Sequence, residues 1–129
     1  MSHPNEVLLR TGYAAFAAGD VPAVLAILDP NITWTSGEHN ALTGVSHGHD
    51  EVVAYFTKLF ELSAGTFTLD VQRIVADDSG AVAVSDATGA RDGRSYAWQI
   101  VHVWEITNGL ATSLTIFSND GQTMNTLFA

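Results

Sequence analysis

His102 is the residue of this sequence best suited to acid–base chemistry. It lies in a run where Trp98, Ile100 and Trp104 recur at every second position, so a strand would place all four on one face. The ordinary pKa of imidazole lies near neutral pH, where the ring can accept or deliver a proton. The pattern indicates a general acid or base. The alternative is a buried neutral histidine that bonds to Thr115 or to a backbone carbonyl.

Two further residues are candidates to assist His102. Tyr13 has a hydroxyl that needs a partner if it is buried, and Asp120 follows the last apolar run. We expect Tyr13 to reach a ligand and Asp120 to lie at the rim of the site, unless Asp120 is a solvated turn residue. Asp86 would orient His102 only if a bulge moved it to the same sheet face.

Large aromatic side chains are the second feature with chemical consequences. Together with residues on the His102 face and at the end of the last strand, they predict the wall of a hydrophobic pocket, although core packing explains any single ring equally well. We expect the ligand-binding residues to be Trp34, Tyr55, Trp98, Ile100, Trp104, Thr115, Phe117 and Asn119.

A third cluster combines histidines and carboxylates between residues 38 and 51. Such residue types can bind a metal ion. The segment runs directly into a predicted helix, and a polar loop at the pocket mouth explains it better, so we expect no metal site. The members of the cluster are Glu38, His39, His47, His49, Asp50 and Glu51.

The elements that position these residues can be read from hydrophobic periodicity. Apolar residues at helical spacing predict three helices: one ending before Gly19, one from Asp20 to about Asp29-Pro30, and one ending near Ser63. Ile32 to Ser36 alternates as a short strand, and residues 37–48 are expected to form a loop. From Thr66 onward the period is two, which predicts strands from Thr66 and at about 81–90, 95–107 and 110–118.

The dipeptides Asp92-Gly93 and Asn108-Gly109 are strong signals for two-residue hairpin turns. Such turns fix the register, which we expect to pair Ala83 with His102 and His102 with Thr115. One face then carries the aromatic residues and His102. The opposite face is uniformly aliphatic and must be covered, so we expect a homodimer through Val82, Val84, Val101, Val103, Leu114 and Ile116.

The composition excludes several classes of function. The 129 residues carry 5 basic against 14 acidic side chains, a net charge of −9, which disfavours nucleic acid and membrane surfaces as partners. The absence of cysteine excludes disulfides and thiol catalysis. No signal peptide and no apolar stretch of roughly 18 residues is visible. We therefore expect one cytoplasmic domain over residues 1–129.

Several short segments resemble the nuclear transport factor 2-like superfamily, in particular its branch of SnoaL-like polyketide cyclases and ketosteroid isomerases. The segments are Ala17-Ala18-Gly19-Asp20, Ile32-Thr33-Trp34, Gly44 with Gly48, Val101-His102-Val103-Trp104 and Asn108-Gly109-Leu110. The resemblance implies an α+β fold in which three N-terminal helices pack on a curved, mostly antiparallel sheet, a cone-shaped cystatin-like barrel. It also implies chemistry that needs no cofactor.

The departures from the isomerase pattern bear on function. The position that matches the isomerase base is Thr35, and the position of its helical tyrosine is Gly12, one residue before Tyr13. In the isomerases that tyrosine and an acid on the penultimate strand form the oxyanion hole, and the position of the acid matches His102. The aspartate found near the end of the last strand in SnoaL-like proteins would fall at Asn119 or Asp120.

Three functions remain open from the sequence. The first is isomerisation, cyclisation, dehydration or hydration of a small hydrophobic substrate, with His102 as acid or base. The second is a non-catalytic module of the same fold that binds a hydrophobic ligand. The third is an interaction domain that acts through the sheet face and has no interior cavity.

Overall fold

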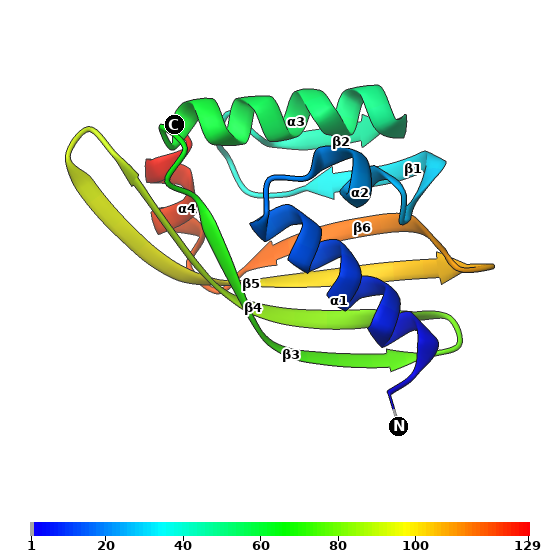
Figure 1. The fold of residues 1–129 in the computed structure, drawn as a ribbon. Coiled ribbons are helices and arrows are strands. Elements are labelled where there is room, and N and C mark those ends of the chain that lie inside the picture. The colour runs from blue at the N-terminus through cyan, green and yellow to red at the C-terminus, as the bar shows by residue number, and fades with distance from the viewer. Residues whose placement is uncertain (1) are drawn as a thin grey trace.

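A computed structural model describes residues 2–129 (Figure 1). Two helices, two strands and a third helix come first, and four consecutive strands and a short helix follow. In chain order they are α1 (Pro4–Ala17), α2 (Val21–Leu25), β1 (Leu28–Ser36), β2 (Gly44–His47), α3 (Gly48–Leu62), β3 (Thr68–Asp77), β4 (Gly80–Arg91), β5 (Arg94–Thr107), β6 (Leu110–Ser118) and α4 (Gly121–Leu127).

The helices begin where the sequence offers capping groups. The His3 ring accepts a hydrogen bond from the backbone N–H of Asn5 at the start of α1. The Asp20 carboxylate accepts one from Ala23 at the start of α2, as expected for an N-cap aspartate. Asp50 lies in the first turn of α3, where negative charge stabilises a helix. Local sequence therefore explains all three starts.

The strands form one open, mixed six-stranded sheet in the order β2-β1-β6-β5-β4-β3. Only β1 and β6 run parallel among the pairs that the structure describes, and the other pairs are antiparallel. Helix α1 crosses the inner face over β3 and β4, while α3 packs along β1 and β2 (Figure 1). The predicted class, helices on a curved mostly antiparallel α+β sheet, is confirmed.

Both predicted hairpin turns are present. Asp92 and Asn108 have φ values of 53° and 52°, and the glycines after them have values of 78° and 77°. Positive φ at both central positions defines the type I′ turn, whose twist matches that of the strands. The predicted pairing of Ala83 with His102 across β4 and β5 is confirmed.

The predicted register of β5 against β6 is wrong by one residue. A β-bulge between Glu105 and Ile106 shifts the pairing, so His102 lies opposite Ile116 and not opposite Thr115. Because side chains alternate with a period of two, this shift exchanges the faces of β6 beyond the bulge. The turn sequence alone carries no signal for the extra residue.

The exchange moves specific side chains. Leu114 and Ile116, which we expected on the outer face, are 0% and 6% exposed and lie on the inner face with His102. Thr115 and Phe117, which we expected on the pocket face, lie on the outer face, where Phe117 is 53% exposed. The outer face of the described sheet therefore keeps Val82, Val84, Val101 and Val103 and gains Phe117.

Three further expectations differ from the structure. Helix α2 ends at Leu25, and Leu28 with Asp29-Pro30 belongs to β1, because Leu28 pairs with Ala111 of the parallel strand β6. The predicted loop over residues 37–48 contains the short strand β2. A fourth helix, α4, was missed because its seven residues are too few to show a helical period.

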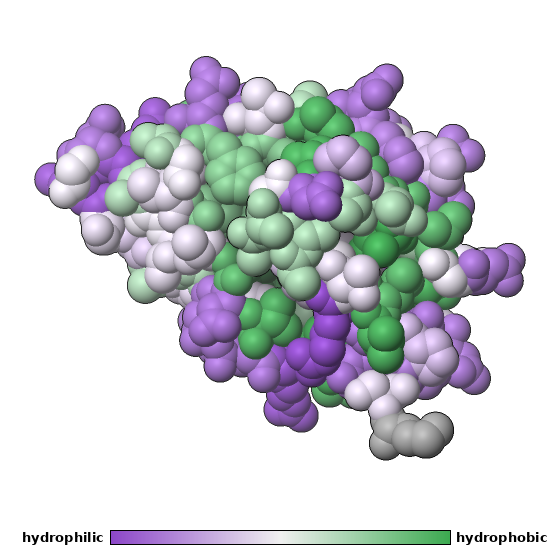
Figure 2. Space-filling model, viewed as in Figure 1, coloured by the Kyte–Doolittle hydropathy of each residue, from purple (hydrophilic) through white to green (hydrophobic). Residues whose placement is uncertain are grey.

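Hydrophobic residues extend across the middle of the helical side of the molecule, between hydrophilic ends (Figure 2). Within the described residues, no helix has the length and apolar character needed to span a membrane. The core lies between these helices and the inner sheet face and includes Leu9, Ile32, Val52, Leu114 and Phe128, each fully or almost fully buried.

Gly80 tests the close approach of β4 to β5, because it lies opposite Glu105 in β5. A methyl group on Gly80 would overlap the backbone oxygen of Trp104, and backbone cannot move aside cheaply. We expect Gly80→Ala to lower the free energy of unfolding by about 2 kcal/mol or more, measured by urea denaturation. Gly37→Ala is the matched control, since its nearest neighbour would be 4.0 Å away. An equal effect of both substitutions would contradict this account.

Candidate functional site

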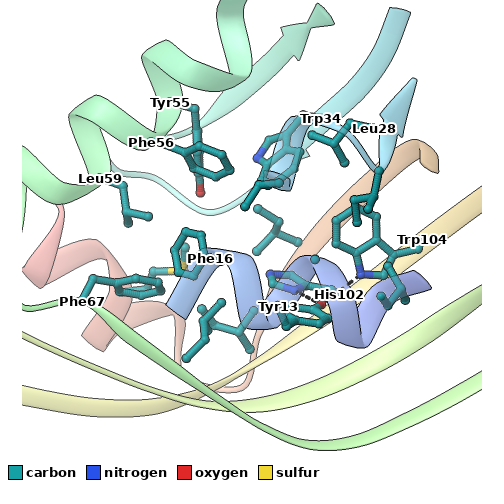
Figure 3. A pocket seen from close by; sticks show the side chains of 18 of the residues that line it. Tyr13, Phe16, Leu28, Trp34, Tyr55, Phe56, Leu59, Phe67, His102 and Trp104 are labelled. Atoms are coloured by element: carbon teal, nitrogen blue, oxygen red, sulfur yellow. Dashed lines mark hydrogen bonds between the residues drawn. The ribbon is translucent and has the colours of Figure 1, made fainter. Parts of the chain in front are cut away.

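A cavity lies between the helices and the inner face of the sheet (Figure 3). About 60 Å³ of it is open to the centre of a water molecule, several times the ~10–15 Å³ that one water needs by the same measure. Its wall is almost entirely apolar or aromatic. The lining residues are Leu9, Gly12, Tyr13, Phe16, Val24, Ile27, Leu28, Trp34, Tyr55, Phe56, Leu59, Phe67, Leu69, Ile100, His102, Trp104, Ile116, Met124 and Phe128.

Four elements bring polar side chains to this cavity. Tyr13 comes from α1, whose apolar face packs on the sheet, and His102 with Trp104 comes from the inner face of β5. Trp34 projects from β1 and Tyr55 from α3 on the other side of the cavity (Figure 3). The polar groups thus face each other across an apolar interior.

Tyr13, His102 and Trp104 form one connected hydrogen-bonded group. The Tyr13 hydroxyl lies 2.6 Å from His102 Nδ1, and Trp104 Nε1 donates to the same hydroxyl at 3.0 Å. The rings of Tyr13 and His102 are stacked, with centroids 5.8 Å apart and planes 5° from parallel. Packing and hydrogen bonds together hold the imidazole in one orientation.

Burial controls the protonation of this group. Desolvation lowers the pKa of His102 to about 4, so the imidazole is neutral at pH 7. Desolvation also raises the pKa of Tyr13 well above its usual value, against a smaller opposing effect of the Trp104 hydrogen bond. The tyrosine therefore keeps its proton, and the pair carries no charge.

The Tyr13–His102 contact can exist with either of two proton placements. If the Tyr13 hydroxyl donates to Nδ1, then Nε2 carries a proton and can donate it toward a ligand. If Nδ1–H donates to the hydroxyl oxygen, Nε2 has a free lone pair that can accept a proton. His102 Nε2 makes no hydrogen bond to any residue from 2 to 129. The pair can thus deliver or receive a proton at Nε2.

A second polar group lies around Tyr55. Burial raises the pKa of the Tyr55 hydroxyl to about 12, and smaller effects of Ser36 and Trp34 oppose this rise. Neither neighbour forms a hydrogen bond with the Tyr55 hydroxyl. Trp34 Nε1 and Ser36 Oγ are both buried without a partner in the described part of the chain. The rings of Trp34 and Tyr55 are 5.7 Å apart between centroids.

The structure brings most of the predicted site residues of the first strand and of β5 to the cavity. Besides Tyr13 and His102, the predicted residues that line it are Trp34, Tyr55, Ile100 and Trp104. Trp98 does not line it, although it lies on the same face of β5. Its ring packs against Phe67 and Phe128 at the end of the core.

The predicted residues beyond the bulge lie elsewhere. Thr115 and Phe117 are on the outer face because the bulge shifts the register of β6 by one residue. The Asn119 side chain accepts a hydrogen bond from the backbone N–H of Gln99 at 2.7 Å. Asp120 is the N-cap of α4, and its bonds with Thr123 lower the pKa of its carboxyl, so it is an ionised, exposed cap outside the cavity wall.

The other polar candidates do not approach His102. Asp86 lies on the outer face opposite Gln99, because no bulge interrupts the pairing of β4 with β5. Among residues 2–129, no three histidine, aspartate or glutamate side chains come together as a metal site. His49 instead contacts the carbonyl of Leu28 at 2.9 Å, and the Glu51 carboxylate accepts from the His47 N–H.

Several lining residues were not predicted. Phe56 and Leu59 belong to the apolar face of α3, so helical periodicity alone would have placed them in the interior. Met124 and Phe128 come from or directly follow α4, which no sequence pattern announced. Arg91 holds this C-terminal segment by donating to the carbonyls of Leu127 and Ala129.

Comparisons with known proteins agree with this architecture. A family model described as a SnoaL-like domain matches residues 9–114. An uncharacterized protein of Mycobacterium tuberculosis is 30% identical over 115 residues, which cover 88% of this chain and 87% of that protein. Among solved structures, an NTF2-like protein of unknown function from Burkholderia pseudomallei has a TM-score of 0.87 at 28% identity and 99% coverage of both chains. Bal32a, from a soil-derived mobile gene cassette, has a TM-score of 0.92 at 23% identity, covering 98% of this chain and 97% of that one.

The lowered pKa of His102 predicts a specific pH dependence of stability. Between pH 6.5, the ordinary value, and about 4, the unfolded chain binds a proton that the folded chain does not. Protonation of His102 in the unfolded chain therefore lowers the free energy of unfolding progressively as the pH falls from 6.5 to about 4. We expect it to total on the order of 3 kcal/mol and to be absent in His102→Gln.

Urea denaturation from pH 7.5 to 4 measures this effect as the difference between the wild type and His102→Gln. His39→Gln is the control, because that side chain is exposed and should leave the wild-type pH dependence intact. Parallel pH profiles for the wild type and His102→Gln would show that His102 is not held neutral by burial.

Proposed function

This chain belongs to the SnoaL-like domain family of the NTF2-like superfamily, and from that membership and its cavity we propose that it catalyses proton transfer on a small hydrophobic molecule. The observation that carries the proposal is the Tyr13–His102 hydrogen bond at the wall of an apolar cavity. A positioned acid–base group of this kind contributes about 10²–10⁴-fold to a rate.

His102 Nε2 is the atom that exchanges a proton with the substrate in this proposal. Tyr13 forms a hydrogen bond with Nδ1, on the other side of the ring. This bond fixes the orientation of the imidazole and determines which ring nitrogen carries the proton. Trp104 holds the Tyr13 oxygen in turn. Isomerisation, cyclisation, dehydration and hydration can each include such a proton transfer.

The lining supports a neutral, apolar substrate. Among the described lining residues, the titratable side chains are Tyr13, Tyr55 and His102, and burial keeps all three neutral at pH 7. An anionic or cationic ligand would lose its hydration without gaining an opposite charge. A ring-shaped molecule matches the aromatic walls.

One observation favours the alternative, a non-catalytic module that binds a hydrophobic ligand. A histidine whose pKa is about 4 is a weak base at neutral pH, and no carboxylate lines the described cavity to strengthen it. Binding without turnover needs only the apolar walls and a few hydrogen bonds. Deuterium exchange into a bound ketone separates the two functions, because a module that only binds its ligand does not accelerate that exchange.

We also propose that a second copy of this chain covers the outer sheet face. One transverse row crosses all six strands through Val75, Val82, Val103, Thr115, Thr35 and Val45. Of the six large hydrophobic side chains that are exposed in the described chain, five lie on this face, including Phe117. An exposed apolar surface of this kind supports a homodimer.

Deuterium exchange into 2-indanone tests the proton-transfer proposal. This neutral bicyclic ketone carries weakly acidic hydrogens next to its carbonyl, and mass spectrometry counts their replacement in D₂O. We expect the wild type to accelerate exchange and His102→Gln to lose roughly 10²-fold or more of the acceleration, since glutamine cannot accept the proton. Tyr13→Phe should show a smaller loss.

His39→Gln, on the exposed loop, is the matched control and should keep the wild-type exchange rate. Equal rates for the wild type and His102→Gln, with 2-indanone still bound to both, would exclude proton transfer by His102. That result would favour the binding module.

Sedimentation velocity tests the proposed homodimer. We expect a dimer for the wild type and a monomer for Val103→Asp, because a charge in the valine row would be buried without a partner. Val7→Asp is the matched control: Val7 is 52% exposed but lies on α1, away from the sheet. A monomeric wild type would refute the interface.

A further inference from the structure

Two buried polar groups on the side of the cavity opposite Tyr13 have no role in the proton-transfer group. Trp34 is 6% exposed and Ser36 is 2% exposed, and within the described chain neither Trp34 Nε1 nor Ser36 Oγ has a hydrogen-bond partner. Buried donors of this kind are rare in folded proteins because each costs free energy. A ligand atom that accepts hydrogen bonds would relieve that cost.

The Tyr55 hydroxyl completes a cluster with these two groups. It descends from α3 into the cavity, and the indole nitrogen of Trp34 lies on the side of that ring facing Tyr55 (Figure 3). Burial raises the pKa of the Tyr55 hydroxyl to about 12, so this hydroxyl keeps its proton and can donate a hydrogen bond. Trp34 and Tyr55 thus present two neighbouring donors at the cavity wall, and Ser36 lies near the Tyr55 hydroxyl.

The chemistry of the cluster selects the ligand atom. An indole N–H can only donate, so the partner must be an acceptor. No lysine or arginine is among the described lining residues, which disfavours a carboxylate or phosphate. The acceptor that fits two neutral donors in an apolar wall is a neutral carbonyl oxygen.

The sheet register places this cluster across from His102. His102 and Ser36 flank Ile116 in the same transverse row, on the strands to either side of β6. Two strand spacings separate their backbones by roughly 10 Å. The side chains extend from there toward the cavity, which leaves a gap that one or two fused rings can bridge.

We propose that Trp34 and Tyr55 bind the carbonyl oxygen of a neutral cyclic ketone, with the carbon that exchanges its proton turned toward His102. This inference rests on the proposed function for the role of His102. In the step, a C–H bond breaks and the proton forms an N–H bond at His102 Nε2. The electron pair moves into the carbonyl group, directly or through a conjugated double bond, and the two donors stabilise the resulting enolate oxygen. Return of the proton restores the imidazole.

The stretching frequency of the carbonyl group in bound 2-indanone reports this contact directly. A carbonyl that accepts two hydrogen bonds absorbs at lower frequency than one in an apolar wall. We expect the wild type to lower the frequency, and Tyr55→Phe and Trp34→Phe each to reverse part of the shift. Both substitutions keep an aromatic ring; Tyr55→Phe removes only the hydroxyl, whereas Trp34→Phe removes the N–H together with the second ring.

Affinity supplies the second measurement. Equilibrium dialysis compares 2-indanone with indane, which has the same rings and no carbonyl. We expect Tyr55→Phe and Trp34→Phe to weaken 2-indanone roughly five- to tenfold relative to indane, the usual effect of one lost hydrogen bond. Trp98→Phe is the matched control, since Trp98 Nε1 is also buried without a partner but lies outside the cavity wall.

The outcomes separate this inference from the proposed function. If His102→Gln, and not Tyr55→Phe, reverses the frequency shift, the carbonyl lies at the His102 end and the inference is wrong, while proton transfer by His102 stands. If the shift depends on Trp34 and Tyr55 but exchange does not depend on His102, the carbonyl site stands and the proposed function is wrong. A wild type that binds 2-indanone no better than indane overturns the carbonyl site.

Discussion

The bulge between Glu105 and Ile106 is the constraint on which both surfaces of the sheet depend. It adds one residue, Thr112, to β6 between the partners of Ile106 and Glu105, so every side chain of β6 that follows changes face. Ile116 consequently joins the inner wall beside His102, and Phe117 lies on the outer face opposite Val101. Cavity and outer surface are therefore two results of one backbone irregularity.

The inner face combines an apolar wall with a few polar groups that burial keeps neutral. The same desolvation lowers the pKa of His102 and raises that of Tyr55. Neutral groups cost less to bury than charged ones, and in a low-dielectric cavity each hydrogen bond they form is stronger than in water. This environment suits a substrate without formal charge and a reaction in which charge appears only briefly.

The two polar clusters differ in how well they are satisfied. Tyr13, His102 and Trp104 bond to one another and hold a fixed geometry without a ligand. Trp34 and Ser36 remain unpartnered in the described chain, at a cost of about 1–3 kcal/mol for each buried group. A protein that keeps such a cost at a cavity wall gains preorganised donors for whatever acceptor enters.

The sequence by itself determined the start of α2 at Asp20, the two hairpin turns, the pairing of β4 with β5 and the inward direction of His102, because these follow from residues close together in the chain. It also identified Tyr13, Trp34, Tyr55 and Trp104 as candidates. Tertiary structure alone decided the register of β6 and the helix α4, since a bulge and a seven-residue helix carry no periodic signal. It also decided which polar atoms meet: Tyr13 and His102 are 89 residues apart, and only packing brings them to 2.6 Å.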